Sequence, residues 1–360
     1  MPKTYPLFDS SIDKVFGGSE VDLYYLSTEL AKDAEFDVSF IVADYGQPQI
    51  QEIEGVRLIK SVNFSQNPLT GAIRLWRAMK TSDADFYILK TASIGTFLTA
   101  LFCRLHRRKF IYRSAHTTHC DGTWIKAHPF SGKLFKWAVR SAEISFVQNE
   151  SDKSLLEKSL GVSSVMLPNG HRLQNCEFGF RDSILWVGRS AAFKKPFAFL
   201  DLARSFPDEK FIMICQQATG DDTYDELTAA ASRIGNFEFI KRVAFKDIDK
   251  YFARAKVFVN TSNAEGFPNT FIQACKASTP ILSLNVNPDG FVDKYSCGVC
   301  CDGNINRLAE ELKIITSTDI GTEMGKNARK YVEEKHDIAR IIEQYKEIFT
   351  RLARHQQGGT

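Results

Sequence analysis

The chain of 360 residues contains no apolar run of the roughly 20 residues that span a bilayer. The longest uncharged stretch of interest, residues 91–103 (TASIGTFLTALFC), is shorter and is typical of a buried helix. The first residues, MPKTYPLFDSSIDKVF, have no apolar core behind a positive start and do not resemble a secretory signal. We therefore expect a cytoplasmic protein.

The eight cysteines lack the spacing of a disulfide framework or a zinc site, so we expect reduced thiols in the core. Cys297, Cys300 and Cys301 cluster, but no second Cys or His pair follows at ligand spacing. Positive charge is not in excess either, because 46 Lys and Arg face 43 Asp and Glu. This balance gives no support for nucleic-acid binding.

The chain does have alternating short apolar runs and amphipathic stretches, the pattern of βαβ units and a parallel sheet. In the first half the predicted strands are TYPLFDSS, FDVSFIVAD, GVRLIK, DFYILK, KFIYRS and AEISFVQN. In the second half they are DSILWVGRS, KFIMICQQ, NFEFIKRV, KVFVNTS and TPILSLNV. The predicted fold class is α/β, and the length suits two domains.

A turn signal, PNG at 168–170, separates the two series. We predict a first domain over residues 1–167, a second over 168–340, and a final helix over 341–360 that packs back on the first. Late helices are expected at about 304–317, 321–334 and 337–353.

A glycine pair precedes the first predicted helix, at about residues 21–33. Ser19 is its expected N-cap, and Asp22 would complete a capping box. Gly17 and Gly18 also suit close approach of a phosphate or another ligand, although a plain capped turn fits the same residues.

Residues that follow strands are the first candidates for ligand contact, because open parallel sheets bind ligands beyond the carboxyl ends of their strands. One strand ends at Gly188 and is followed by Arg189, Lys194 and Lys195. Cations near a helix start can hold a diphosphate together with the free helix amides. Ordinary exposed basic residues fit this segment as well.

The most specific segment is VFVNTSNAEGFPNTFIQACKASTPIL, residues 257–282. Glu265 follows a strand there and can accept hydrogen bonds from sugar hydroxyls, and Pro268 suits a first helical turn. Asn269 and Gln273 are four residues apart, so we expect a polar helix face toward the ligand. The core-facing positions of this helix are Phe271, Ala274 and Cys275.

A third candidate segment, KFIYRSAHTTHCDGTW, brings His116, His119 and Asp121 to the end of a strand in the first half. Histidine can hydrogen-bond a sugar hydroxyl or transfer a proton near neutral pH. A packed histidine or a surface loop fits the same residues.

The segment AEGFPNTFIQA resembles the paired-glutamate motif of the retaining GT-B glycosyltransferases of family 4, in which seven residues separate two glutamates. The resemblance extends over nearly the whole chain through GGSE, LPNG, VGR with its lysine, and NARKYVEEKHD. It implies two Rossmann-like domains facing each other across a cleft. It also implies transfer of a sugar from a nucleotide-diphosphate sugar to a saccharide or lipid-linked acceptor.

By this resemblance, Arg189 and Lys194 bind the donor diphosphate, Glu265 binds the donor sugar and His116 lies near that sugar, so these four are the predicted catalytic residues. Gln273 replaces the second glutamate. Its amide can still bind ribose hydroxyls but lacks the stronger charge-assisted bond. The predicted donor-binding residues are Gly17, Gly18, Gly188, Arg189, Lys194, Glu265, Gly266, Phe267, Pro268, Asn269, Thr270 and Gln273.

Two Asp-x-Asp pairs could in principle chelate a metal. Asp83 and Asp85 precede a predicted strand, and Asp247 and Asp249 open a helix, so neither pair stands at the carboxyl end of a strand. We expect no metal and no cofactor.

Residues 69–80 (LTGAIRLWRAMK) combine Ile73 and Trp76 with three basic residues on a short amphipathic helix, and 104–109 (RLHRRK) adds a cationic turn. This pattern fits peripheral contact with anionic lipid at the inner face of the membrane, but also a solvated helix packed on its own sheet.

Two other functions fit the same sequence. The first is a scaffold that keeps the GT-B shape, with Gln273 marking a decayed donor site. The second is a sugar-nucleotide epimerase, which would convert its donor without an acceptor.

Overall fold

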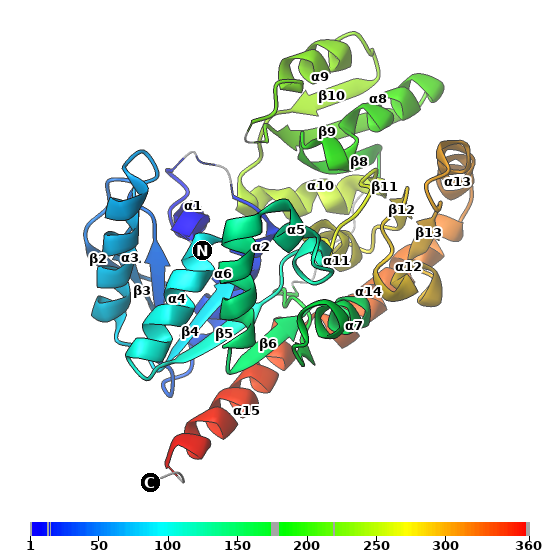
Figure 1. Cartoon of the computed structure of the whole chain (residues 1–360). Coiled ribbons are helices and arrows are strands. Elements are labelled where there is room, and N and C mark those ends of the chain that lie inside the picture. Colours follow the sequence, from blue (N-terminus) through cyan, green and yellow to red (C-terminus); the bar gives the residue numbers. More distant parts are fainter. Residues whose placement is uncertain (1, 13, 15, 174–179, 219, 358–360) are drawn as a thin grey trace. The chain divides into compact units, whose positions relative to one another are not determined.

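The computed structural model describes every residue except 1, 13, 15, 174–179, 219 and 358–360. The chain divides into two compact units, one formed by Met1–Arg172 with His336–Thr360 and the other by Leu173–Lys335. Each unit combines parallel strands with covering helices, as the alternation of apolar runs predicts (Figure 1).

The described elements of the first unit are, in chain order, η1 (Pro2–Thr4), α1 (Tyr5–Phe8), α2 (Gly18–Leu30), β1 (Ser39–Val42), β2 (Ile50–Ile53), β3 (Val56–Lys60), α3 (Pro68–Ser82), β4 (Phe86–Lys90), α4 (Ile94–Leu105), β5 (Lys109–Arg113), η2 (Thr117–His119), α5 (Thr123–Ala127), α6 (Pro129–Arg140), β6 (Ile144–Val147), α7 (Glu150–Leu160), β7 (Val165–Met166) and α15 (Ile338–Gln357).

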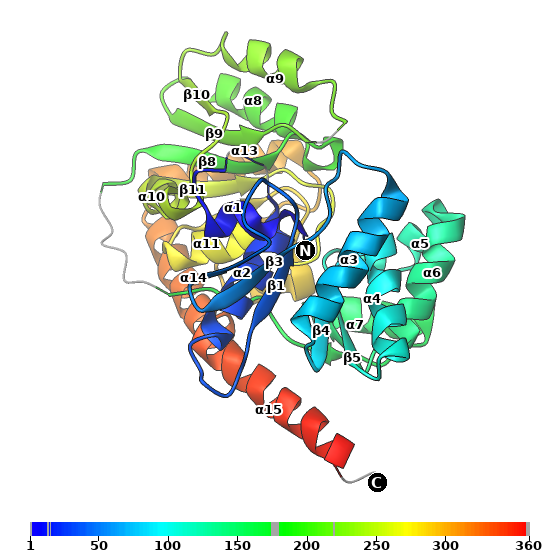
Figure 2. The ribbon, with the colours of Figure 1, turned by 90° about the vertical axis from the view of Figure 1, so that its left-hand side faces the viewer.

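The strands of this unit form two sheets instead of the one parallel sheet that we predicted. β1 pairs in parallel with β3, and β2 joins β3 in the antiparallel direction. The other sheet has the order β4-β5-β6-β7 and is parallel throughout. Figure 2 shows β1 and β3 next to each other and β4 and β5 as a separate group.

The strand predicted at TYPLFDSS is wrong, because Pro2–Thr4 is a 3-10 turn and Tyr5–Phe8 is helical. Pro6 cannot donate a ladder hydrogen bond, and its fixed φ suits a first helical turn. Tyr5 and Phe8 then lie on one helix face, where both are buried. Their rings pack on those of Tyr45 and Tyr24.

The first long helix begins earlier than predicted, and its cap differs. α2 starts at Gly18, and the Glu20 carboxylate accepts the Gly17 amide at 3.0 Å. Because Glu20 supplies the acidic half of the capping box, Ser19 falls inside the first turn instead of capping it. Asp22, two residues after Glu20, is buried.

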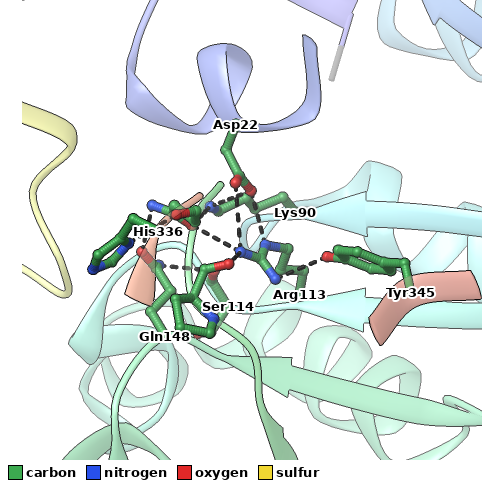
Figure 3. Close-up of polar contacts among 9 residues, drawn as sticks. Asp22, Lys90, Arg113, Ser114, Gln148, His336 and Tyr345 are labelled. Atoms are coloured by element: carbon green, nitrogen blue, oxygen red, sulfur yellow. Dashed lines mark hydrogen bonds and ion pairs between the residues drawn. The ribbon is translucent and has the colours of Figure 1, made fainter. Parts of the chain in front are cut away.

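A buried polar network gives Asp22 its role (Figure 3). Its carboxylate accepts hydrogen bonds from Lys90 Nζ and Arg113 Nε, both at 2.8 Å. Arg113 also donates to the Tyr345 hydroxyl at 2.9 Å and to Asn169 Oδ1 at 2.8 Å. These bonds connect α2, the ends of β4 and β5, the turn at residue 169 and α15, so the last helix packs within the first unit.

The elements of the second unit are β8 (Ser183–Arg189), η3 (Ala192–Lys194), α8 (Pro196–Ser205), β9 (Lys210–Gln216), α9 (Tyr224–Ala231), β10 (Phe237–Ile240), η4 (Phe245–Asp247), α10 (Ile248–Arg254), β11 (Ala255–Asn260), α11 (Asn269–Lys276), β12 (Ile281–Ser283), η5 (Pro288–Gly290), α12 (Phe291–Lys294), β13 (Gly298–Cys300), α13 (Ile305–Ser317) and α14 (Ile320–Lys335).

The six described strands of the second unit are all parallel and follow the order β10-β9-β8-β11-β12-β13. The five predicted strands are present, and β13 is an addition that the sequence pattern did not indicate. Helices cover both faces, so apolar clusters lie on either side of the sheet, one around Trp186 and Phe199 and the other around Phe258 and Phe271.

Seven cysteines are free and buried, as expected, and Cys176 lies outside the described residues. Across the described part of the chain, no helix has both the length and the apolar character needed to cross a membrane.

Candidate functional site

The strand order of the second unit reverses at β8. β8, the first strand of this unit, pairs with the second strand, β9, on one side and with the fourth, β11, on the other. Open α/β sheets bind ligands beyond the carboxyl ends of the strands at such a switch point. The segments that follow β8 and β11 are therefore the candidate site, and they are two of the three segments that we selected from the sequence.

An ion pair joins these two segments. Lys194 Nζ lies 2.9 Å from Glu265 Oε2, and each side chain is only 13% exposed. The other carboxylate oxygen of Glu265 accepts hydrogen bonds from Ser262 Oγ at 2.7 Å and Asn260 Nδ2 at 3.2 Å. Burial alone would raise the pKa of Glu265, but the charge of Lys194 and these donors hold it below its usual value. Glu265 is therefore an ionised, oriented acceptor.

Further hydrogen bonds hold the two segments in place. Thr261 Oγ1 donates to the Lys194 carbonyl at 2.6 Å and accepts from Trp186 Nε1 at 2.9 Å. The Asn263 amide donates to the Phe193 carbonyl at 2.8 Å. The loop after β8 is thus tied to the loop after β11, which positions the Lys194 ammonium against the carboxylate.

Arg189 is the last residue of β8, and its side chain is exposed. Among the described residues it has no ion-pair partner, so its charge is available to an anion. The preceding residue must be glycine, because a Cβ at Gly188 would come within 2.8 Å of the Trp186 ring. Lys195 is also exposed, and α8 begins directly after it at Pro196.

The helix of the predicted motif, α11, begins at Asn269 with Pro268 as its N-cap residue. Phe271, Ala274 and Cys275 are buried, as predicted. Gln273, expected on an open polar face, is only 8% exposed. Because α10 and α14 both pack against α11, little of this short helix remains open. Gly266 and Phe267 are also buried, whereas Thr270 is half-buried.

The three residues selected after β5 have different local roles. His116 precedes η2, and its Nδ1 accepts the Thr118 amide at 3.2 Å. Asp121 accepts the Thr123 amide at 2.7 Å in the turn directly before α5. His119 packs against the rings of Trp124 and Phe135, with ring-centre distances of 6.4 and 6.2 Å. His119 therefore matches the packed-histidine interpretation, and Asp121 the loop interpretation.

His119 should make the first unit sensitive to acid. Burial lowers its pKa to about 4, compared with about 6.5 in an unfolded chain. The unfolded state then binds more protons between these values, so stability falls as the pH drops from 6.5 toward 4. Between pH 7 and pH 4.5 the starting protein loses unfolding free energy. We expect His119→Gln to lose about 2 kcal/mol less over the same range. Urea unfolding at both pH values measures this.

The control for this prediction is His106→Gln, because His106 is exposed. An equal change of acid sensitivity in both variants would contradict the prediction.

The glycine turn at α2 is already occupied by the chain itself. The Gly17 amide donates to Glu20, so a phosphate would have to displace that carboxylate to reach this donor. The turn therefore matches the capped-turn interpretation in this structure.

The aspartates of both Asp-x-Asp pairs make ion pairs with cations of the protein itself. Arg108 contacts both Asp83 and Asp85, at 2.5 and 3.0 Å. Asp247 pairs with Lys250 at 2.6 Å, and Asp249 pairs with Lys276 at 2.9 Å. No group of three potential metal ligands is found in the part of the chain that the structure describes.

Sequence reasoning missed the three residues that support the central pair, which are Asn260, Thr261 and Ser262. The available signal was three consecutive small polar residues at the end of an apolar strand and just before Glu265. Such residues stand where they can bond backbone and side chains of the adjoining loops.

Comparison with known proteins agrees with this fold. Residues 16–175 match the model of Glycosyltransferase Family 4, and residues 179–333 match that of Glycosyl transferases group 1. The structure of HepE from Anabaena in complex with UDP and glucose superposes with a TM-score of 0.72 at 15% identity, covering 93% of this chain and 96% of that one. The predicted GT-B architecture is thereby confirmed at the level of the fold.

Two characterised enzymes are similar over part of the sequence. The 2-deoxystreptamine N-acetyl-D-glucosaminyltransferase of Niallia circulans is 25% identical over 164 residues, which are 43% of this chain and 41% of that enzyme. The capsular polysaccharide biosynthesis glycosyltransferase CapM of Staphylococcus aureus is 27% identical over 128 residues, 34% of this chain and 33% of CapM. The chain thus matches less than half the length of either enzyme. With both halves matched to glycosyltransferase families, the chain belongs to the glycosyltransferases of the GT-B fold.

Proposed function

We propose that this protein is a retaining glycosyltransferase that moves a sugar from a nucleotide diphosphate to a saccharide or lipid-linked acceptor without a divalent metal. The observation that carries the proposal is the Lys194–Glu265 ion pair at the switch point of the second unit. It places a cation and an oriented carboxylate at the edge of the sheet where a nucleotide ligand is expected.

The donor would separate the two partners of this pair. Lys194 and the exposed Arg189 would neutralise the diphosphate as negative charge develops on it, and electrostatic stabilisation of this kind lowers the barrier. Glu265 would accept hydrogen bonds from the sugar hydroxyls. Ser262 and Asn260 would keep it oriented after Lys194 has turned to the phosphates.

The retaining outcome rests on the family resemblance, and the absence of a metal rests on the available charges. Fixed cations can replace a divalent ion at a leaving diphosphate. Both Asp-x-Asp pairs are bound by cations of the protein itself, so they are poor candidates for a metal site. The proposed partners are a nucleotide sugar and a saccharide or lipid-linked acceptor.

A two-stage experiment tests the proposal. Nucleoside diphosphates and their sugars are first screened by thermal shift, because a ligand that binds only the folded state raises the unfolding temperature. The donor found is then incubated with candidate acceptors in EDTA, and the anomeric configuration of the product is read by NMR. Loss of transfer in EDTA with rescue by manganese, or an inverted product, would contradict the proposal.

The same experiment separates the two other functions. A scaffold would bind nucleotide but release no sugar, and an epimerase would isomerise the donor when no acceptor is present.

We expect Glu265→Gln to lower kcat/KM for the donor about 10- to 100-fold. Hydrogen bonds to a charged group contribute about 1.5–3 kcal/mol, and an amide cannot replace them fully. Binding of the free nucleoside diphosphate should not weaken, because Glu265 is assigned to the sugar and its loss frees Lys194 for the phosphates. Steady-state kinetics with the donor varied measures both quantities.

Glu226→Gln is the matched control, since Glu226 is exposed on α9. Unchanged donor kinetics in Glu265→Gln would show that the assigned role is wrong.

We also propose peripheral membrane contact, although residues 69–80 expose a smaller apolar surface than expected. Trp76 packs on Phe102, with ring centres 5.1 Å apart, and is not directed outward. Leu69 and Ile73 are 74% and 54% exposed and could still enter a lipid surface. Flotation with anionic vesicles tests this contact, which should be lost when both residues are changed to glutamate. Equal flotation of that variant would contradict it.

A further inference from the structure

A cavity of about 1270 Å³ lies within the first unit. Its lining includes Phe40 and Ile41 of β1 and also Ile88 and Leu89 of β4, so it separates the two sheets of this unit. Pockets for small ligands measure roughly 300–1,000 Å³. This cavity is larger, and two strands border it.

β4 presents an unpaired edge to the cavity. Among the described residues β4 pairs only with β5, and the Lys109 amide donates to the Asp85 carbonyl there. Successive residues of a strand direct their backbone groups to alternate sides. Asp85 faces β5, so Phe86 and Ile88 direct their N–H and C=O groups to the cavity.

β1 also presents backbone groups of its free edge to the cavity. The Ser61 amide of the β3 side donates to the Val42 carbonyl, so Ile41 directs its backbone groups away from β3 and toward the cavity. The next residue on this side, Ala43, already has a partner, because its amide donates to the Pro2 carbonyl at 2.7 Å. Pro2 therefore occupies the position where a strand in the cavity would end.

Each remaining wall carries apolar side chains. Leu23 and Leu26 of α2, Leu75 and Met79 of α3, and Phe349 of α15 line the cavity on the sides that the strands leave open. A strand buried on both faces has apolar side chains at almost every position. The walls thus favour an apolar occupant, and the two edges favour a peptide backbone.

We propose that this cavity binds one extended apolar peptide strand of about five residues, parallel to β1 and β4, with its carboxyl end at Pro2. The connection from β3 through α3 to β4 is of the crossover type that joins parallel strands, so one inserted strand can pair with both edges. Its length follows from β1 and β4, which have four and five residues. The inserted strand joins the two sheets into one.

The full chain is tested with the segment Ile-Val-Ile-Leu-Val in two arms, as a free peptide and joined directly ahead of residue 1. Hydrogen–deuterium exchange follows the amides of Ile41 and Ile88, and thermal unfolding follows stability. We expect at least tenfold slower exchange at both amides in the joined form. We also expect an unfolding temperature higher by about 2 °C, the effect of one or two added kcal/mol in a chain of this size.

Two controls separate strand pairing from simple filling of an apolar cavity. The first is the same segment with proline at its second and fourth positions, which removes two of its ladder donors. The second is Ile88→Pro in the chain, which removes one N–H on the cavity side and leaves the bonds to β5 in place. Ser39→Pro makes the same change on β1 if Ile88→Pro does not fold. The proline-containing segment should abolish the protection of both amides. Each proline variant of the chain should abolish it at the amide of the opposite edge, which is Ile41 for Ile88→Pro and Ile88 for Ser39→Pro.

Three results would overturn the proposal. One is equal protection by the proline-containing segment, which would indicate an apolar ligand site without a ladder. Another is protection that grows with protein concentration in the unextended chain, which would indicate a second copy in the cavity. The third is no change of exchange or unfolding temperature in either arm. Because all readouts are independent of sugar transfer, they do not depend on the proposed function.

Discussion

Replacing Arg189 with alanine is expected to lower kcat for sugar transfer about 100-fold or more while changing the free energy of unfolding by less than about 0.5 kcal/mol. The side chain is exposed, and among the described residues it makes no ion pair, so the folded chain loses little when it is removed. The departing diphosphate, in contrast, loses a fixed positive charge in the transition state. Release of nucleoside diphosphate measures kcat, and urea unfolding measures stability.

Lys194 should behave differently, although it serves the same diphosphate. Its partner Glu265 is only 13% exposed, so Lys194→Met leaves a nearly buried carboxylate without its counter-ion. We expect a similar loss of kcat together with a loss of stability. The double variant Lys194→Met with Glu265→Gln should recover stability and remain inactive, because the cost of the unpaired charge disappears while the leaving group stays unneutralised.

Arg233→Ala is the matched control for Arg189→Ala, because Arg233 is exposed after α9 in the same unit. Normal turnover in Arg189→Ala, or an equal loss in Arg233→Ala, would show that Arg189 does not act on the leaving group.

Local patterns predicted most of the strands and the two loops of the candidate site. Each apolar run from FDVSFIVAD onward forms a strand, because short apolar runs bounded by turn signals favour strands that pack in a sheet. The site loops follow from one further rule, that ligands bind where strands end. Arg189, Lys194 and Glu265 were selected in this way, although their functional roles stay predictions.

Contacts between distant residues could not be predicted in the same way. The bond from Thr261 to the Lys194 carbonyl spans 67 positions, and the bond from Arg113 to Asp22 spans 91. No local pattern encodes either partner. Asp22 was assigned to a helix cap because a capping box is a local signal, whereas its actual partners arrive with β4 and β5. The division of the first unit into two sheets is likewise a property of pairing between strands and not of any single strand.

The largest loss of stability is expected at Asp22. Its carboxylate is the counter-ion of two cations, Lys90 and Arg113, and all three side chains are at most 5% exposed. Burial would raise the pKa of Asp22, but the charges of Arg113 and then Lys90 hold it below the ordinary value. Burial lowers the pKa of Lys90 to about 8 despite its carboxylate partner, which indicates how costly the buried ammonium is.

We therefore expect Asp22→Asn to reduce the free energy of unfolding by about 3–5 kcal/mol, the usual cost of leaving a buried charge without its partner. Urea unfolding at pH 7 measures it. Glu157→Gln is the control, because it removes one carboxylate from the exposed surface of the same unit. The prediction is wrong if both variants lose equally little.

The stability should also depend on pH, because the pKa of Asp22 differs between the folded and the unfolded chain. A carboxylate whose pKa is lower in the folded chain stabilises it above the unfolded value, near 3.8, and this contribution is lost as the pH falls through the folded value. Asp22→Asn should remove this part of the acid unfolding, so the variant and the starting protein should converge in stability at low pH.

Adding Lys90→Met to Asp22→Asn removes one of the two cations that have lost their counter-ion. It should restore part of the stability, and a coupling energy above about 1 kcal/mol in the resulting double-mutant cycle would assign the loss to the buried charges and not to a packing change at α2.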